Sequence, residues 1–256
     1  MRGISLNAVY ILWLREMKTF YRAKSRIIGT VVTPIFLLGF LGSGFAGAIL
    51  PGIPASVDYL MFLTPGIIAM TMIFTSMFTG LSVLWDRRYG FLKEIMVTPV
   101  SRVTIVLGRI AGGTTTSMIE GLSILAISLL FGFQVGGIID LTLTMVFMLL
   151  ISVSFIGLGL AIASMLRDEQ GFGLIMNLII SPLIFLSGIF YPIENLPTAL
   201  RVISYLNPLT YGVDGLRGAL IDVSFLPAVL NLAILTGFCV AVVLLGAYLF
   251  EKNEAV

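Results

Sequence analysis

Residues 141–166 read LTLTMVFMLLISVSFIGLGLAIASML and contain no charged side chain. About 20 consecutive apolar residues in an α-helix are enough to cross the roughly 30 Å hydrocarbon core of a bilayer. Further apolar runs of similar length occupy residues 27–50, 61–84, 105–131, 172–190 and 229–250. A transmembrane barrel strand needs only about 9–11 residues of alternating polarity, which these runs lack. The sequence therefore predicts six membrane-spanning α-helices.

The composition supports the same fold class. Hydrophobic residues make up 58% of the 256-residue chain and charged residues only 11%, and the mean hydropathy is +1.09. Soluble domains are about one quarter charged, so we exclude soluble enzymes, nucleic-acid binders and disordered chains. Histidine is absent from the sequence, which argues against zinc sites and Ser-His chemistry. The lone Cys239 has no partner for an internal disulfide.

Positive charges predict the orientation, because cytoplasmic loops of membrane proteins are enriched in Lys and Arg. Of the 15 Lys and Arg residues, all but Arg201 and Arg217 fall before the first run, in the loop between the second and third runs with its flank, or directly after the fourth and sixth runs. An even number of spans places both termini on one side. We therefore expect both termini to be cytoplasmic.

The segment before the first span, residues 4–24, is too charged to cross a bilayer but has an apolar stripe at steps of three and four. The stripe contains Trp13 and Tyr10, and basic residues lie opposite. This pattern predicts an amphipathic helix in the cytoplasmic headgroup layer. The helix serves either as a simple anchor or as a docking element for a cytoplasmic partner.

The predicted cytoplasmic loop 86–102 mixes charges with apolar residues at helical spacing before Pro99. A short amphipathic helix under the membrane is a poor core element and a suitable contact for another protein. A plain solvated turn, the alternative, would need no apolar face.

The outer segment 191–228 is rich in proline but too apolar for a free loop. Asn207 followed by Pro208 is typical of a helix cap with proline at the first helical position. We expect short helices in this segment that are re-entrant or interfacial and close the outer mouth. Asp214 and Arg217, three residues apart, are expected to form a surface ion pair.

Two motifs resemble a known family. Residues 89–102, YGFLKEIMVTPVSR, and residues 187–198, SGIFYPIENLPT, with 206–217, LNPLTYGVDGLR, closely resemble the ABC type-2 permeases. These are the membrane subunits of ATP-driven exporters of drugs, lipid-linked glycans and polysaccharides. The resemblance covers essentially the whole chain, 1–256, as a single transmembrane permease domain.

The resemblance implies a role for each motif. The first motif would be a coupling helix seated on a separate cytoplasmic ATPase subunit, with these contact residues: Arg88, Tyr89, Gly90, Phe91, Leu92, Lys93, Glu94, Ile95, Thr98, Pro99 and Arg102. The second would form an outer gate with these residues: Pro192, Pro197, Asn207, Pro208, Tyr211, Asp214 and Arg217.

The resemblance also implies an assembly. Two permease copies and two ATPase subunits would work by alternating access in the cytoplasmic membrane of a prokaryote. No G-x-x-x-x-G-K-[ST] occurs in the sequence, so this chain is not expected to be an enzyme or to bind a cofactor. ATP and Mg²⁺ would bind to the partner ATPase, and the surrounding lipids would be a further partner; no nucleic acid is expected.

Three features of the spans suggest more specific roles. Small residues repeat every four positions at Gly39, Ser43 and Gly47, which makes this surface a hypothesis for the seam of a homodimer. Glu120 lies deep in a span, either as a neutral carboxyl joining helices or as a proton-coupling or substrate-binding group. An apolar substrate wall is expected from these residues: Met70, Phe74, Met77, Phe78, Phe185 and Phe190.

Other function classes remain alternatives. An ion-driven secondary transporter would have inverted repeats with paired broken helices, and matching halves are not visible in this sequence. An intramembrane enzyme is hard to assemble without histidine and with Glu120 as the one deeply placed ionisable group. A membrane scaffold that transports nothing is a third alternative. The sequence does not identify the substrate.

Overall fold

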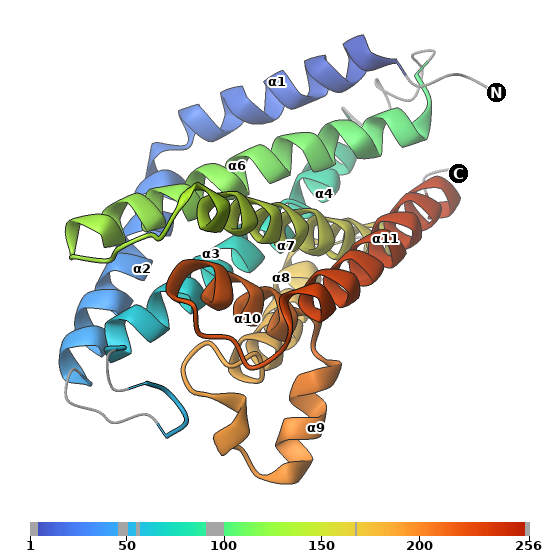
Figure 1. The fold of residues 1–256 in the computed structure, drawn as a ribbon. Coiled ribbons are helices and arrows are strands. Elements are labelled where there is room, and N and C mark those ends of the chain that lie inside the picture. Colours follow the sequence, from blue (N-terminus) through green and yellow to red (C-terminus); the bar gives the residue numbers. More distant parts are fainter. Residues whose placement is uncertain (1–4, 46–50, 55–56, 91–99, 167, 254–256) are drawn as a thin grey trace.

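A computed structural model describes residues 5–45, 51–54, 57–90, 100–166 and 168–253, and all regular elements among them are helical. Figure 1 shows their arrangement. In chain order the elements are α1 (Leu6–Arg22), α2 (Lys24–Gly44), α3 (Tyr59–Phe78), α4 (Leu81–Arg88), α6 (Arg102–Leu130), α7 (Ile138–Met165), α8 (Glu169–Phe185), η1 (Ile193–Asn195), α9 (Thr198–Leu206), α10 (Pro208–Ile221) and α11 (Ala228–Asn253). The predicted all-α class is confirmed.

Four helical segments in the described part of the chain are long and apolar enough to span a membrane. They are Tyr59–Arg88, which joins α3 and α4, then Arg102–Leu130, Ile138–Met165 and Ala228–Phe250. Of two shorter apolar helices, Val32–Gly44 falls within the predicted span 27–50, and Glu169–Phe185 overlaps the predicted span 172–190. The protein is therefore multi-pass, and the count of six spans stays a prediction.

Helix α7 lies at the centre of the bundle, where glycines allow neighbouring backbones to approach. It packs against α11, α3, α10 and α6. A Cβ atom added to Gly80 would lie 2.4 Å from the carbonyl oxygen of Gly159, so the α3–α4 junction touches the α7 backbone. On another face of α7, Gly157 meets the backbone of Val242 in α11. Substitutions at these glycines would push helices apart.

Helix α1 lies beside the first half of α6 (Figure 1). The contact is close because Leu12 and Glu16 of α1 fill the space where Gly108 and Gly112 of α6 lack side chains. With 29 residues, α6 is about 44 Å long, some 14 Å more than the hydrocarbon core. The N-terminal part of α6 can therefore project beyond the core and carry α1 there. Placement of α1 in the headgroup layer remains a prediction.

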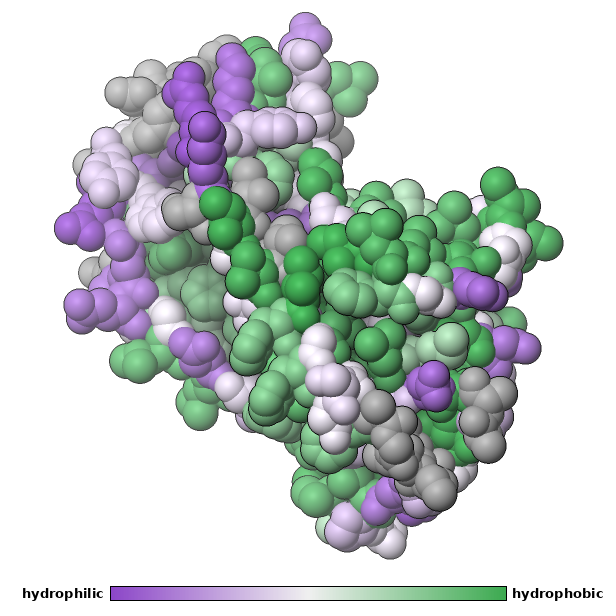
Figure 2. All heavy atoms as spheres, turned by 90° about the vertical axis from the view of Figure 1, so that its left-hand side faces the viewer, coloured by the Kyte–Doolittle hydropathy of each residue, from purple (hydrophilic) through white to green (hydrophobic). Residues whose placement is uncertain are grey.

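The surface is divided by polarity. In Figure 2, hydrophilic residues gather at the upper end of the face, where α1 lies, and a broad hydrophobic area follows below. Exposed large apolar side chains on α2 include Val32, Phe36 and Phe40. The start of α1 and the end of α11 lie at the same end of the bundle (Figure 1). This distribution suits a protein whose middle is surrounded by lipid.

Candidate functional site

Helix α4 leads into the predicted coupling segment, residues 88–102, and its last residue is the first of that segment. It ends at Arg88, and Gly90 then adopts a left-handed φ of +78°, a conformation that glycine takes without strain. Tyr89 is 77% exposed, so its ring is available for a contact outside the chain. Among the predicted coupling residues, the structure describes Arg88, Tyr89, Gly90 and Arg102. The others lie outside the described residues: Phe91, Leu92, Lys93, Glu94, Ile95, Thr98 and Pro99.

A buried carboxylate holds α4 against two other helices. Asp86 accepts hydrogen bonds from Arg15 of α1, with Nη1 at 2.8 Å from Oδ2, and from Arg109 of α6. Arg109 is 1% exposed and also donates to the Ser82 hydroxyl, and its Nη1 lies 3.6 Å from a carboxylate oxygen of Glu16. The hydrogen bond with Asp86 raises the pKa of Arg15. We name Arg15, Glu16, Asp86 and Arg109 the inner ion cluster.

This cluster was not predicted from the sequence. Arg109 counted only as one of the positive charges that set orientation, although it lies inside α6, eight positions after the Ser101 N-cap. A cation placed that far into an apolar helix needs a buried partner. That need was the available signal, but the sequence does not tell which carboxylate supplies it.

A second set of contacts ties α4 to α8. Arg88 Nη1 lies 2.8 Å from Glu169 Oε1, and Arg87 donates to the carbonyl oxygen of Leu166 at 2.6 Å. The Arg88 guanidinium lowers the pKa of the Glu169 carboxyl, which precedes the apolar part of α8. The exposed Arg88–Glu169 pair is worth little stability by itself. Together the two contacts fix the end of α4 next to the α7–α8 connection.

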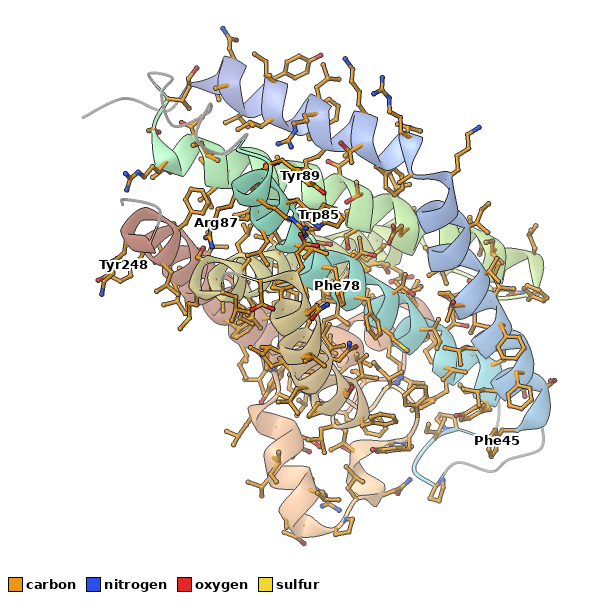
Figure 3. All side chains as sticks on the ribbon, turned by 180° about the vertical axis from the view of Figure 1, so that it is seen from behind. Phe45, Phe78, Trp85, Arg87, Tyr89 and Tyr248 are labelled. Atoms are coloured by element: carbon orange, nitrogen blue, oxygen red, sulfur yellow. The ribbon has the colours of Figure 1, made fainter. Side chains whose placement is uncertain are left out.

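A cavity of about 510 Å³ lies between α1, α3, α4 and α6. We name it the inner cavity. Of the predicted substrate wall, Phe74 and Phe78 line it, and Met70 lines a smaller groove of about 250 Å³ between α2 and α3. Figure 3 shows Phe78, Trp85 and Tyr89 following one another along the end of α3 and α4. Trp85 and Tyr89 also line the cavity.

The other wall residues lie elsewhere. Met77 is fully buried and its backbone packs against Gly159. Phe185 and Phe190 contact each other, with ring centroids 5.8 Å apart. The carbonyl oxygen of Phe190 also accepts a hydrogen bond from the Tyr59 hydroxyl at 3.2 Å. The six residues therefore do not form one surface within the chain.

Glu120 is 2% exposed and joins α6 to α3. Its Oε2 accepts a hydrogen bond from the Thr75 hydroxyl. One turn away, Ser117 accepts a hydrogen bond from Ser76 at 3.1 Å and one from Ser152 of α7 at 3.0 Å. This polar layer links three helices, which is the role of an interhelical contact.

The predicted outer gate has short helices in the expected places. Asn207 caps α10 by accepting from the Leu209 N–H at 3.0 Å, and its amide donates to the Leu183 carbonyl at 2.7 Å. Pro208 is the first residue of α10, and the Tyr211 hydroxyl donates to the Tyr205 carbonyl at 2.7 Å. Pro192 and Pro197 directly precede η1 and α9. Most of α10 is buried against α7, α11 and α3.

The expected surface pair of Asp214 and Arg217 is wrong. Both side chains are buried, and each has other partners: Asp214 accepts from the backbone N–H groups of Phe225 and Leu226, and Arg217 donates to the Gly188 carbonyl at 2.9 Å. The Arg217 guanidinium also lies 3.8 Å from the centre of the Phe62 ring. Burial lowers the pKa of Arg217 to about 10, so it stays charged at neutral pH.

The described residues contain no group of three His, Cys, Asp or Glu that could hold a metal ion. The described residues form a cavity whose lining includes the exposed Tyr89 and three members of the inner ion cluster, Arg15, Glu16 and Asp86. Through these contacts, a movement of α4 would be passed on to α1 and α6.

Comparisons with known proteins agree with this picture. The family model described as "ABC-2 type transporter" matches residues 7–221. The inner membrane transport permease YadH of Escherichia coli strain K12 is 27% identical over 250 residues, covering 96% of each chain. A putative transport permease, ycf38 of Pyropia yezoensis, is 30% identical over 219 residues, covering 83% of this chain and 73% of its own. Nodulation protein J of Rhizobium leguminosarum bv. viciae is 23% identical over 245 residues, covering 94% and 93%. The chain belongs to the ABC-2 type transporter family.

Proposed function

We propose that this chain is the permease subunit of an ATP-driven exporter and moves an amphiphilic or lipid-linked substrate out of the cytoplasm or the inner leaflet. Two copies would work with two cytoplasmic ATPase subunits, and both chain termini would be cytoplasmic. Hydrolysis of ATP would take place on the partner, because this sequence has no phosphate-binding loop.

The observation that carries the proposal is the inner ion cluster. The predicted coupling segment follows α4 directly, and Asp86 on α4 binds both Arg15 of α1 and the buried Arg109 of α6. A displacement of the coupling segment by an ATPase would therefore move α4 together with α1 and α6. Packed helices with paired buried charges move as units, because separating them exposes an uncompensated charge.

Alternating access supplies the rest of the mechanism. Closure of the ATPase pair on ATP would shift α4 and change the opening of the inner cavity, which lies between the helices that the cluster joins. The substrate would then leave at the outer segment, where α9 and α10 lie. The ion-driven alternative needs no ATPase, and a scaffold would need neither the cavity nor the cluster.

The test uses the permease co-expressed with a candidate ABC ATPase subunit. Glu94→Arg with Leu92→Asp reverses the charge and removes an apolar contact in the predicted coupling helix. We expect the pair to stop co-purifying and ATP hydrolysis to lose its dependence on the permease. Asp58→Arg with Leu206→Asp, at exposed positions of the opposite end, is the matched control and should leave the complex intact.

An unchanged complex in the first variant would remove the coupling assignment. Transport by the permease alone under an ion gradient would support the secondary transporter instead.

A further inference from the structure

The inner cavity and the α2–α3 groove share a wall. Phe74 and Thr75 line both spaces, although the cavity opens between α1, α3, α4 and α6 and the groove between α2 and α3. Their volumes, about 510 and 250 Å³, together match the size of a site for a small ligand. A ligand that occupied both would pass the Phe74 ring.

The two spaces differ in polarity. The groove is lined mainly by apolar groups, including Leu37, Ile67 and Met70. The cavity combines aromatic rings with hydroxyl groups and charged side chains of α1 and α4. A molecule with an alkyl chain in the groove and a polar head in the cavity fits this division.

The serine and threonine hydroxyl groups that line the cavity all act as hydrogen-bond donors within the protein. Each described serine and threonine of the lining already donates its proton, four of them to backbone carbonyls at 2.8–3.0 Å and Thr75 to Glu120; they are Thr19, Thr75, Thr79, Ser82 and Thr116. A hydroxyl that has donated its proton can only accept further hydrogen bonds. The aliphatic hydroxyls therefore offer lone pairs to a ligand.

The charged groups that line the cavity also favour a ligand head without negative charge. Glu16 and Asp86 line the cavity with Arg15, while Arg109 is 1% exposed and lies behind them. The Arg15 guanidinium is bound to Asp86. Among the described lining residues there are therefore two carboxylates and one cation, and this cation is already bound to Asp86, so a phosphate or carboxylate head would meet repulsion from them. The aromatic faces of Phe74, Phe78 and Trp85 favour a cation or the C–H groups of a polyol.

We propose that the inner cavity and the α2–α3 groove together bind one amphiphile, whose head donates hydrogen bonds and carries no negative charge and whose alkyl chain lies along Phe74. A primary ammonium and a glycerol-type polyol share this chemistry. The inference deepens the proposed function by naming the class of substrate, and it rests on that function for the transport step only.

The first experiment compares heads on the same twelve-carbon chain. The permease without ATPase is placed in lipid nanodiscs with Trp13→Phe, so that Trp85 is the remaining tryptophan and reports binding by fluorescence. The donating probes are dodecylammonium and 1-O-dodecylglycerol; the controls are dodecyltrimethylammonium, which has no N–H, and dodecyl phosphate. We expect the better donating probe to bind at least tenfold more tightly than either control, and its identity decides between ammonium and polyol. Equal binding of a control would overturn the proposal.

The second experiment removes lone pairs. Thr79→Val keeps the side-chain shape and should weaken the donating probe about five- to tenfold while leaving dodecyltrimethylammonium unchanged. Thr79→Ser keeps the hydroxyl and should restore binding. Thr142→Val is the matched control, because Thr142 donates to the Ile138 carbonyl in the same way but on an exposed face of α7. If Thr79→Val weakened the binding of all probes equally while Thr79→Ser bound them like the unmodified protein, the hydrogen-bond argument would be contradicted.

The third experiment fills the groove. A Cβ atom at Gly29 meets nothing within 4 Å, so Gly29→Leu fits on α2 and narrows the space for the chain. We expect weaker binding of twelve-carbon probes and little effect on six-carbon probes; an equal effect on both would remove the groove from the site.

Addition of the ATPase separates the two proposals. Head-selective binding without stimulation of ATP hydrolysis would retain the site and remove its role in transport. Stimulation of ATP hydrolysis by the probes without selectivity for the head group would support the proposed transport function and contradict the proposed binding site.

Discussion

Replacement of Asp86 by asparagine would leave Arg109 as a cation inside the bundle, with Glu16 as the one carboxylate that remains near it among the described residues. Arg109 is 1% exposed, and removal of one partner of a buried ion pair costs about 3–5 kcal/mol. Glu16 lies 3.6 Å from the Arg109 guanidinium and compensates in part. We therefore expect the free energy of unfolding to fall by about 3 kcal/mol in Asp86→Asn, at the lower end of that range.

The neighbouring variants should follow a definite order. Arg15 has a side chain that is 36% exposed, so Arg15→Gln should cost below about 1 kcal/mol. In Arg109→Gln, the Asp86 carboxylate keeps Arg15 as a partner, and we expect a loss of about 2 kcal/mol. The double variant Asp86→Asn with Arg109→Gln removes both buried charges together, and its loss should be smaller than that of Asp86→Asn alone.

The assay is unfolding in mixed micelles by titration with dodecyl sulfate, followed by circular dichroism at pH 7. The coupling free energy between Asp86 and Arg109 comes from the four variants of the cycle. A loss below about 1 kcal/mol in Asp86→Asn, or a double variant less stable than the single, would refute the reasoning about the buried cluster.

Substitutions at three further positions, Gly80, Glu120 and Asn207, test the packing and the polar contacts, with a control at Gly39. Gly80→Ala should destabilise the protein by about 1–3 kcal/mol, because the added Cβ would lie 2.4 Å from the Gly159 carbonyl oxygen. Gly39→Ala is the control: a Cβ there meets nothing within 4 Å, and the free energy of unfolding should change by less than about 1 kcal/mol in the same titration. Glu120→Gln keeps an acceptor for the Thr75 hydroxyl and should retain both stability and ATP-driven transport. Glu120→Ala should lower the free energy of unfolding by about 1–3 kcal/mol. Loss of transport in a stable Glu120→Gln variant would instead favour proton coupling or substrate contact. Asn207→Ala removes the α10 cap and the bond to Leu183, so thermal unfolding should show a loss of about 1–2 kcal/mol; an unchanged midpoint would contradict the role of this cap.

Much of the fold follows from local sequence signals. The uncharged run at 141–166 predicts α7, and Asn207-Pro208 predicts the start of α10. These features depend on burial of a continuous segment and on hydrogen bonds between neighbouring residues. Such interactions are contained within a few turns of chain, so the sequence is sufficient to find them.

The candidate site depends on contacts between distant segments. Asp86 and Arg109 are 23 positions apart, with the coupling segment between them, and Arg15 comes from another helix. Their meeting depends on how α1 fits over Gly108 and Gly112, which helical periodicity alone does not specify. The prediction for Asp214 was wrong for a related reason. Helical spacing favours a pair with Arg217, but the chain after α10 folds back, and the backbone N–H groups of Phe225 and Leu226 donate to the Asp214 carboxylate.

The central claim is that this chain receives mechanical work from an ATPase at the end of α4. The direct measurement is photocrosslinking with benzoylphenylalanine in place of Tyr89, which is 77% exposed, in cells that co-express the candidate ATPase subunit. The control carries the same group at Val229, which is 78% exposed at the start of α11, at the other end of the bundle. We predict a crosslink to the ATPase from position 89 and none from position 229. Absence of a crosslink at 89, or an equal yield from both positions, would contradict the account.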